Sequence, residues 1–168
     1  MATQNADTPS TMRNRIGLTF LGAAFAFLVG AITVAKYQES RVVADPGNLE
    51  QVARGKPVYA QHCASCHGAN LEGQAKWQEK LPSGRMPAPP HDASGHTWHH
   101  PDTVLFGITK YGLVPGKYAP PKYESDMPAF GAQLADEDIW AVLAYIKSGW
   151  PEQIRQAQAE ISRGAKKP

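Results

Sequence analysis

The sequence lacks a second pair of cysteines, any pattern typical of β-strands and an excess of positive charge. From Val42 onward 13 basic and 13 acidic side chains cancel, so the basic stripe of a nucleic-acid-binding protein is absent. A thioredoxin-type dithiol needs a strand followed by a helix, and the missing strands argue against one. Because Cys63 and Cys66 are the only cysteines of the 168 residues, no second Cys-x-x-Cys pair completes a zinc site. We therefore expect an all-α protein that binds no nucleic acid.

One segment is rich in apolar residues and has no charge. Ile16–Ala35 is 20 residues long and uncharged. As a helix it would span about 30 Å, the thickness of a bilayer core. Arg13 and Arg15 precede it and place the N-terminus in the cytoplasm. The alternative is a cleaved signal peptide ending near Ala35, but the apolar part of such peptides is usually only about 7–15 residues long. We expect an uncleaved transmembrane anchor, and the predicted parts are a cytoplasmic segment (1–15), the anchor (16–35), a linker (36–47), a folded domain (48–150) and a polar helical tail (151–168).

Three helices are predicted in the folded domain. Asn48 and Gln51 form a capping pattern for a helix that runs to His62, where Pro57 should cause a kink or a restart. A second helix is expected over 99–112 and a third over 135–151, the latter acidic at its start and followed by proline. The connecting segments 68–97 and 113–126 are rich in turn-forming residues.

The only two cysteines stand three positions apart, in Cys63-Ala64-Ser65-Cys66-His67. A disulfide between them would close a very small loop and remove little chain entropy. The Cys-x-x-Cys-His pattern is typical of c-type haem attachment, in which the two thiols form thioethers with the haem vinyl groups and the histidine binds the iron. We therefore predict one covalently attached haem c, with Cys63, Cys66 and His67 holding it.

The second axial ligand of the iron has several candidates. Met127 lies 60 residues after His67, far enough for the chain to wrap the haem and return on its other face, and Pro128 stiffens the loop there. Met86, only 19 residues on, is expected in the cavity wall or on the surface. A histidine ligand or an open site are the remaining possibilities.

Four histidines fall within ten residues, at positions 91, 96, 99 and 100. Such a cluster could bind copper. The interpretation we favour is loop polarity, helix capping and contacts with the haem propionates. His62, beside Cys63, is expected to be solvated.

The Cys63–His67 motif, the late Asp-Met-Pro-Ala-Phe stretch at 126–130 and the closing helix together resemble class I monohaem cytochromes c over residues 48–150. The resemblance implies an all-α fold whose helices wrap one covalently bound haem, with Gly55 and Tyr59 of the first helix facing Val142 and Tyr145 of the last. It also implies that a proline carbonyl accepts a hydrogen bond from His67. Pro89 and Pro90 are the candidates, and Pro90 is the residue we assign. Trp98 should bond a haem propionate or form part of the hydrophobic wall.

The resemblance implies an electron carrier rather than an enzyme, with the iron held by His67 and Met127. We expect it on the periplasmic side of a bacterial inner membrane, tethered to the lipid bilayer. Expected partners are a quinol-oxidising complex, a terminal oxidase or reductase, or a dehydrogenase. The alternatives are a haem subunit of a dehydrogenase, oxidase or reductase complex, and an open-site sensor or peroxidase.

Overall fold

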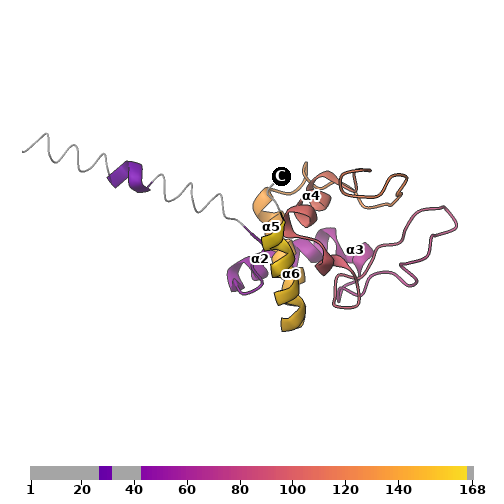
Figure 1. The fold of residues 1–168 in the computed structure, drawn as a ribbon, viewed down its shortest axis with the longest axis horizontal. Helices are drawn as coiled ribbons and strands as arrows, with labels where there is room; N and C mark the ends of the chain where they lie inside the picture. Colours follow the sequence, from indigo (N-terminus) through magenta and orange to yellow (C-terminus); the bar gives the residue numbers. More distant parts are fainter. Residues whose placement is uncertain (1–26, 32–42, 166–168) are drawn as a thin grey trace, which may run out of the picture. The chain divides into compact units, whose positions relative to one another are not determined.

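The computed structural model describes residues 27–31 and 43–165, and its helices form an all-α domain (Figure 1). Within that part of the chain the backbone forms no β-strand, only two isolated bridges. The prediction that the folded domain is all-α is therefore confirmed. The helices are α2 (Leu49–His62), α3 (Ala64–His67), the 3-10 turn η1 (Thr97–His99), α4 (Asp102–Tyr111), α5 (Asp136–Ser148) and α6 (Glu152–Gly164).

The chain divides into two compact units, residues 1–42 and 43–168. Most of the predicted anchor, Ile16–Ala35, lies outside the described residues, as do the predicted segment 1–15 and much of the linker. Residues 27–31 are described and helical. Among the described residues, no helix combines the length and the apolar character needed to cross a membrane.

Helix α2 begins where its sequence predicts. The Asn48 side chain accepts a hydrogen bond from the Gln51 amide at 3.0 Å, which satisfies one of the free N–H groups of the first turn. Pro57 lies inside this helix, yet the helix runs unbroken from Leu49 to His62. Of the two expected outcomes at Pro57, the restart is wrong, and the kink stays a prediction. The surrounding turns pack on α5, which helps to maintain the helix despite the missing backbone bond.

Helices α2 and α5 cross at very close range. A Cβ atom on Gly55 would lie 1.9 Å from the carbonyl oxygen of Ala141, so only glycine fits at the crossing. One turn later, Tyr59 is 1% exposed, and its ring centroid lies 5.4 Å from that of Tyr145. Tyr59 and Val142 also share one hydrophobic cluster. The facing positions predicted from the sequence are confirmed.

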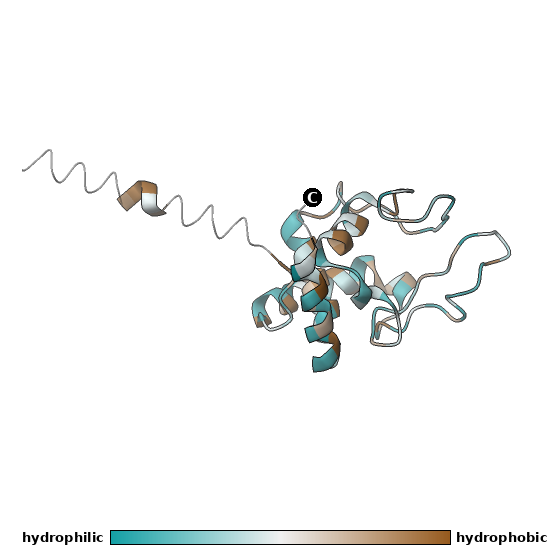
Figure 2. Ribbon diagram, viewed as in Figure 1, coloured by the Kyte–Doolittle hydropathy of each residue, from teal (hydrophilic) through white to brown (hydrophobic). Residues whose placement is uncertain are grey.

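Helix α5 joins the two halves of the hydrophobic core. Ile139 and Leu143 pack with residues of α4 and the segment before α5, whereas Val142 and Ile146 pack with α2 and Trp150. The helices carry hydrophilic and hydrophobic residues in alternation along their ribbons, as expected when one face is buried (Figure 2). Since Val142, Leu143 and Ile146 also line the cavity described below, α5 forms the support on which the site is built.

Helix α6 is docked rather than frayed. Its Gln158 is 0% exposed and donates hydrogen bonds to the Asp102 carboxylate at 2.7 Å and to the carbonyl of His100 at 3.1 Å. Asp102 also forms a buried ion pair with Lys147, at 2.9 Å. The predicted polar helical tail is thus helical over Glu152–Gly164, but the sequence did not reveal its docking, because a buried glutamine in a polar sequence is indistinguishable from a solvated one.

Candidate functional site

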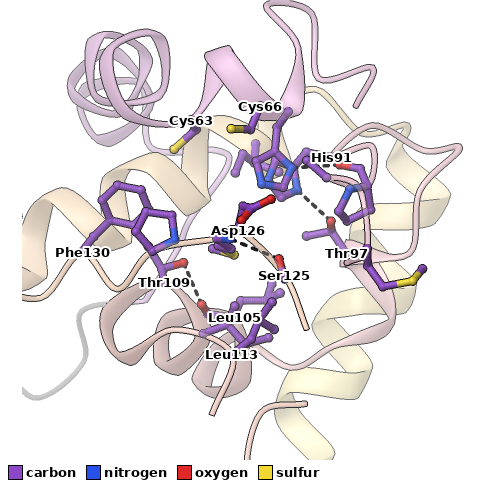
Figure 3. A pocket seen from close by; sticks show the side chains of 18 of the residues that line it. Cys63, Cys66, His91, Thr97, Leu105, Thr109, Leu113, Ser125, Asp126 and Phe130 are labelled. Carbon is purple, nitrogen blue, oxygen red and sulfur yellow. Dashed lines mark hydrogen bonds between the residues drawn. The ribbon is translucent and has the colours of Figure 1, made fainter. Parts of the chain in front are cut away.

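Four of the six predicted site residues, Cys63, Cys66, His67 and Met127, line one cavity of about 260 Å³. The other two, Pro90 and Trp98, do not line it. Its walls come from α2–α3, α4, α5 and the two loop segments between them. Figure 3 shows Cys63 and Cys66 at one end of the cavity and Leu105 and Leu113 at the other. Most of the lining is apolar, as is usual for a site that binds an organic cofactor.

The cysteine motif occupies the junction between α2 and α3. The amide of Cys63 donates to the carbonyl of Tyr59 at 2.9 Å, and the amide of His67 donates to the carbonyl of Cys63 at 2.9 Å. These bonds wind the motif into one helical turn, and all three side chains line the cavity. Both cysteines are free thiols, so the disulfide alternative is not realised.

Burial raises the pKa of the Cys63 thiol to about 11, with the nearby Cys66 adding to the shift. Redox-active cysteines have the opposite property, a lowered pKa that favours the thiolate. The site therefore does not have the electrostatics of a dithiol oxidoreductase. It presents two free thiols at the edge of an apolar cavity, and burial favours the neutral form of Cys63.

His67 is fixed by a backbone carbonyl. Its side chain is 7% exposed, and Nδ1 lies 2.9 Å from the carbonyl oxygen of Pro89. A carbonyl only accepts hydrogen bonds, so Nδ1 carries the proton and Nε2 has a lone pair available for a metal. Burial lowers the pKa of His67 more than the Pro89 carbonyl raises it, which favours the neutral imidazole that metals require.

The assignment of this contact to Pro90 is wrong by one residue. The carbonyl of Pro90 faces the other way, where the Thr97 hydroxyl donates to it at 3.4 Å. A Cβ on Gly95 would lie 2.0 Å from that same oxygen, so the segment after Pro90 closes over it. Consecutive carbonyls of an extended segment point in different directions, and only that of Pro89 reaches His67.

Met127 and Met86 both line the cavity. Met127 is partly buried against the cluster that contains Phe130, and its amide donates to the Ser125 hydroxyl at 3.1 Å. The Met86 amide donates to the carbonyl of Glu124 at 2.9 Å, which ties the two methionine-bearing segments together. An ion pair of 2.6 Å between Arg85 and Asp126 reinforces this connection.

Trp98 does not line the cavity. Its indole packs against the cluster of Tyr59 and Trp150 and stacks on His99, with ring centroids 3.6 Å apart. Its Nε1 is buried without a hydrogen-bond partner among the described residues. A buried donor of this kind normally has a partner. Its contact with a propionate remains a prediction.

The structure gives His91, one of the four clustered histidines, a contact that the sequence does not predict. The ring of His91 stacks on that of His67 with centroids 3.9 Å apart, and its Nδ1 lies 2.9 Å from the Thr97 hydroxyl. His62 also lines the cavity, with its ring 6.0 Å from that of Phe130, so the expectation of a solvated residue is wrong. A histidine directly after two prolines carries no recognisable sequence signal for such stacking.

The part of the chain that the structure describes contains no group of three or more histidine, cysteine, aspartate or glutamate side chains arranged to hold a metal ion. The copper interpretation of the histidines at 91–100 thus gains no support. The donor set of the cavity fits a c-type haem instead. Two free thiols lie beside a neutral imidazole whose Nε2 is available, and apolar walls contain two methionine thioethers.

Comparisons with known proteins agree with this donor set. A family model described as Cytochrome c matches residues 52–150. A thiosulfate dehydrogenase from Stutzerimonas stutzeri (strain A1501) is 28% identical over 109 residues, which cover 63% of this chain and 30% of that protein. The chain thus matches less than a third of the relative's length. No solved structure matches the chain.

Proposed function

The chain belongs to the cytochrome c family, and we propose that it carries single electrons between redox proteins through one haem c with histidine and methionine ligands. Members of the family hold their haem covalently, so this is a haem c electron-transfer domain. The observation that carries the proposal is the hydrogen bond between His67 Nδ1 and the Pro89 carbonyl. It leaves Nε2 free in a cavity that also contains Cys63, Cys66 and Met127.

In this proposal Cys63 and Cys66 would hold the haem through thioether bonds, each S–H adding across one vinyl group, and His67 and Met127 would be the ligands of its iron. When bound, the haem supplies a metal centre that accepts and releases one electron. The Pro89 carbonyl orients the imidazole and increases its basicity, while the thioether of Met127 and the apolar walls favour the reduced state.

The substitution Met127→Ala tests the assignment of the second ligand. We expect the oxidised holoprotein to lose the weak sulfur-to-iron absorption band and the reduced form to bind carbon monoxide rapidly, because one axial position opens. Met86→Ala is the matched control, since Met86 lines the same cavity, and it should keep the band and exclude carbon monoxide. A band that survives in Met127→Ala would reject Met127 as the ligand.

We further propose that Ile16–Ala35 anchors the protein in the bacterial inner membrane, with the haem domain on the periplasmic side. The support is the 20-residue uncharged run preceded by Arg13 and Arg15. A tethered carrier would exchange electrons with a quinol-oxidising complex and a terminal oxidase or reductase. Fractionation tests this location: the full chain should stay with membranes after a high-salt wash, and a chain lacking residues 1–35 should not.

The similarity to a thiosulfate dehydrogenase favours a second candidate function. In this alternative the domain is the haem subunit of a dehydrogenase complex and passes electrons on from a catalytic partner. Purification from gently solubilised membranes distinguishes the two. A catalytic protein that copurifies in fixed proportion favours the subunit, whereas a haem domain recovered alone favours the mobile carrier.

A further inference from the structure

Two histidines of the cavity wall have rings held in place by packing. His96 stacks on Trp77 with centroids 5.4 Å apart and an interplanar angle of 11°. His100 meets His96 edge to face, again at 5.4 Å, with an angle of 71°. Both residues line the cavity, on either side of the turn η1. The two imidazoles therefore form a contacting pair, in which His96 is exposed and His100 is half-buried.

The position of His100 is fixed from behind by helix α6. Its carbonyl accepts a hydrogen bond from Gln158, whose amide also donates to the Asp102 carboxylate. Gln158 is fully buried, and Lys147 neutralises Asp102. This network holds the backbone at His100 and uses no atom of its ring, so the imidazole stays available to the cavity.

The ring nitrogens of His96 and His100 have no hydrogen bond or ion pair with any described residue. Burial lowers the pKa of both imidazoles, with smaller contributions from the neighbouring histidines. Without an added anion both rings are thus neutral at neutral pH. Each then offers one N–H donor and can gain a second by protonation.

A haem brings two propionate carboxylates into this cavity, and a carboxylate removed from water requires hydrogen-bond donors. Gln74, Tyr123 and Ser125 also line the cavity, but three other polar groups of the wall are less suited to this task. The hydroxyls of Thr97 and Thr109 already donate to the carbonyls of Pro90 and Leu105. Asp126 is itself acidic.

We propose that His96 and His100 bind a haem propionate by donating ring N–H hydrogen bonds to it. One of the two imidazoles takes up a proton when the propionate is bound beside it. The inference rests on the proposed placement of the haem in this cavity. It extends that proposal by giving the site a proton-linked redox property.

The charges around the pair determine the sign of the effect. His91 and His99 come from the same segment, Asp102 is neutralised by Lys147 behind His100, and Asp126 on the cavity wall pairs with Arg85. Oxidation of the iron adds one positive charge nearby and favours loss of the imidazolium proton. The electron passes to a one-electron acceptor and the proton to solvent. The midpoint potential should therefore fall as pH rises through the titration of the pair.

The test is a redox titration of the full-length holoprotein between about pH 5 and about pH 9, the range in which histidine titrates. We expect the wild-type midpoint potential to decline with pH and the double variant His96→Gln/His100→Gln to lose that decline. His99→Gln is the matched control, because His99 belongs to the same turn but does not line the cavity, and it should keep the wild-type slope. The single variants, His96→Gln and His100→Gln, should each move the titration to a different pH.

A wild-type potential independent of pH, or a decline that persists in the double variant, would overturn the proposal. Equal flattening by His99→Gln would also do so, because the effect would then be general to the segment. The infrared difference spectrum between oxidised and reduced protein gives a second readout, in which the propionate carboxylate band should shift only in the cavity-facing variants. The sulfur-to-iron band should survive in all of them, so its loss would instead indicate failure of the proposed axial ligation.

Discussion

The His67 side of the cavity and the Met127 side differ in how the chain holds them. His67 follows directly from α2, which packs against α5 across Gly55, and its ring is fixed by a buried carbonyl. Met127 lies between a Pro-rich loop and α5, and its neighbour Asp126 pairs with Arg85, where the two side chains are 70% and 40% exposed. An exposed ion pair contributes only about 0–1 kcal/mol. One proposed ligand is thus built into the helical core. The other lies in a loop whose ion pair is exposed, and the nearest backbone bond from this loop to a helix is that of the Phe130 amide to the Thr109 carbonyl of α4 at 3.0 Å.

This difference indicates which ligand the iron would lose first. The peptide that carries His67 is held by Tyr59, which donates to the carbonyl of Gly68 at 2.8 Å, and by the Gly73 amide, which donates to the His67 carbonyl at 2.7 Å. On the other side the Met127 amide has a single side-chain partner, Ser125. We therefore expect partial unfolding to detach the methionine while the histidine stays bound.

The largest loss of stability is expected from Gly55→Ala, which disrupts the close crossing of α2 and α5 that supports the His67 side. The added Cβ would meet the Ala141 carbonyl at 1.9 Å, where only backbone movement can relieve the clash. Such overpacking costs typically about 1–3 kcal/mol and occasionally more, and we expect the upper end. Chemical denaturation of the holoprotein, followed by circular dichroism, measures the loss.

Gly164→Ala is the matched control for that substitution. Gly164 ends α6, and a Cβ there would meet no atom within 4 Å. Its unfolding free energy should stay level or rise slightly, since alanine favours the helix. Similar losses in both variants would show that the close crossing of α2 and α5 is not what supports the His67 side.

A smaller effect is expected from Tyr59→Phe, which keeps the packing and removes one hydroxyl. Burial raises the pKa of Tyr59, so the phenol stays protonated and donates to the Gly68 carbonyl at any ordinary pH. Its removal leaves that carbonyl without this donor, at a cost of about 1–2 kcal/mol. Tyr111→Phe, at a residue 52% exposed, should change the unfolding free energy little. No difference between the two variants would contradict the role given to this hydrogen bond.

The smallest effect on stability is expected from Arg85→Gln, which removes both the ion pair with Asp126 and the hydrogen bond that Arg85 donates to the Ser125 carbonyl on the Met127 side. Global stability should fall by less than about 1 kcal/mol. The sulfur-to-iron band should nevertheless disappear at a lower denaturant concentration than in the wild type, whereas Arg155→Gln, which breaks an exposed pair within α6, should leave it unchanged. A loss as large as that of Gly55→Ala would show that the two sides are held equally firmly.

The parts predicted correctly from the sequence depend on short-range spacing. The Asn48 cap, the helix around Val142 and the facing pair Gly55 and Tyr59 follow from helical periodicity, which a single sequence shows directly. The clustering of Cys63 and His67 on one cavity wall follows in the same way, since one turn joins them.

The parts that were missed depend on the path of the loops. Whether the carbonyl of Pro89 or of Pro90 meets His67 is decided by Gly73 and Gly95, whose missing side chains let the segment close on both sides. The stacking of His91 on His67 follows from that same path. Burial of Gln158 could not be read from a polar helix, because its partner lies 56 residues earlier in the chain.

The docking of α6 also bears on where this domain can be cut. The family match ends at residue 150, yet Gln158 reaches back to the carbonyl of His100, and Ser162 accepts a hydrogen bond from the Asp102 amide at 3.0 Å. A protein shortened to the family boundary would keep every proposed haem ligand and lose the brace behind the histidine pair. The family match therefore covers less of the chain than the packed domain does, because it leaves out helix α6.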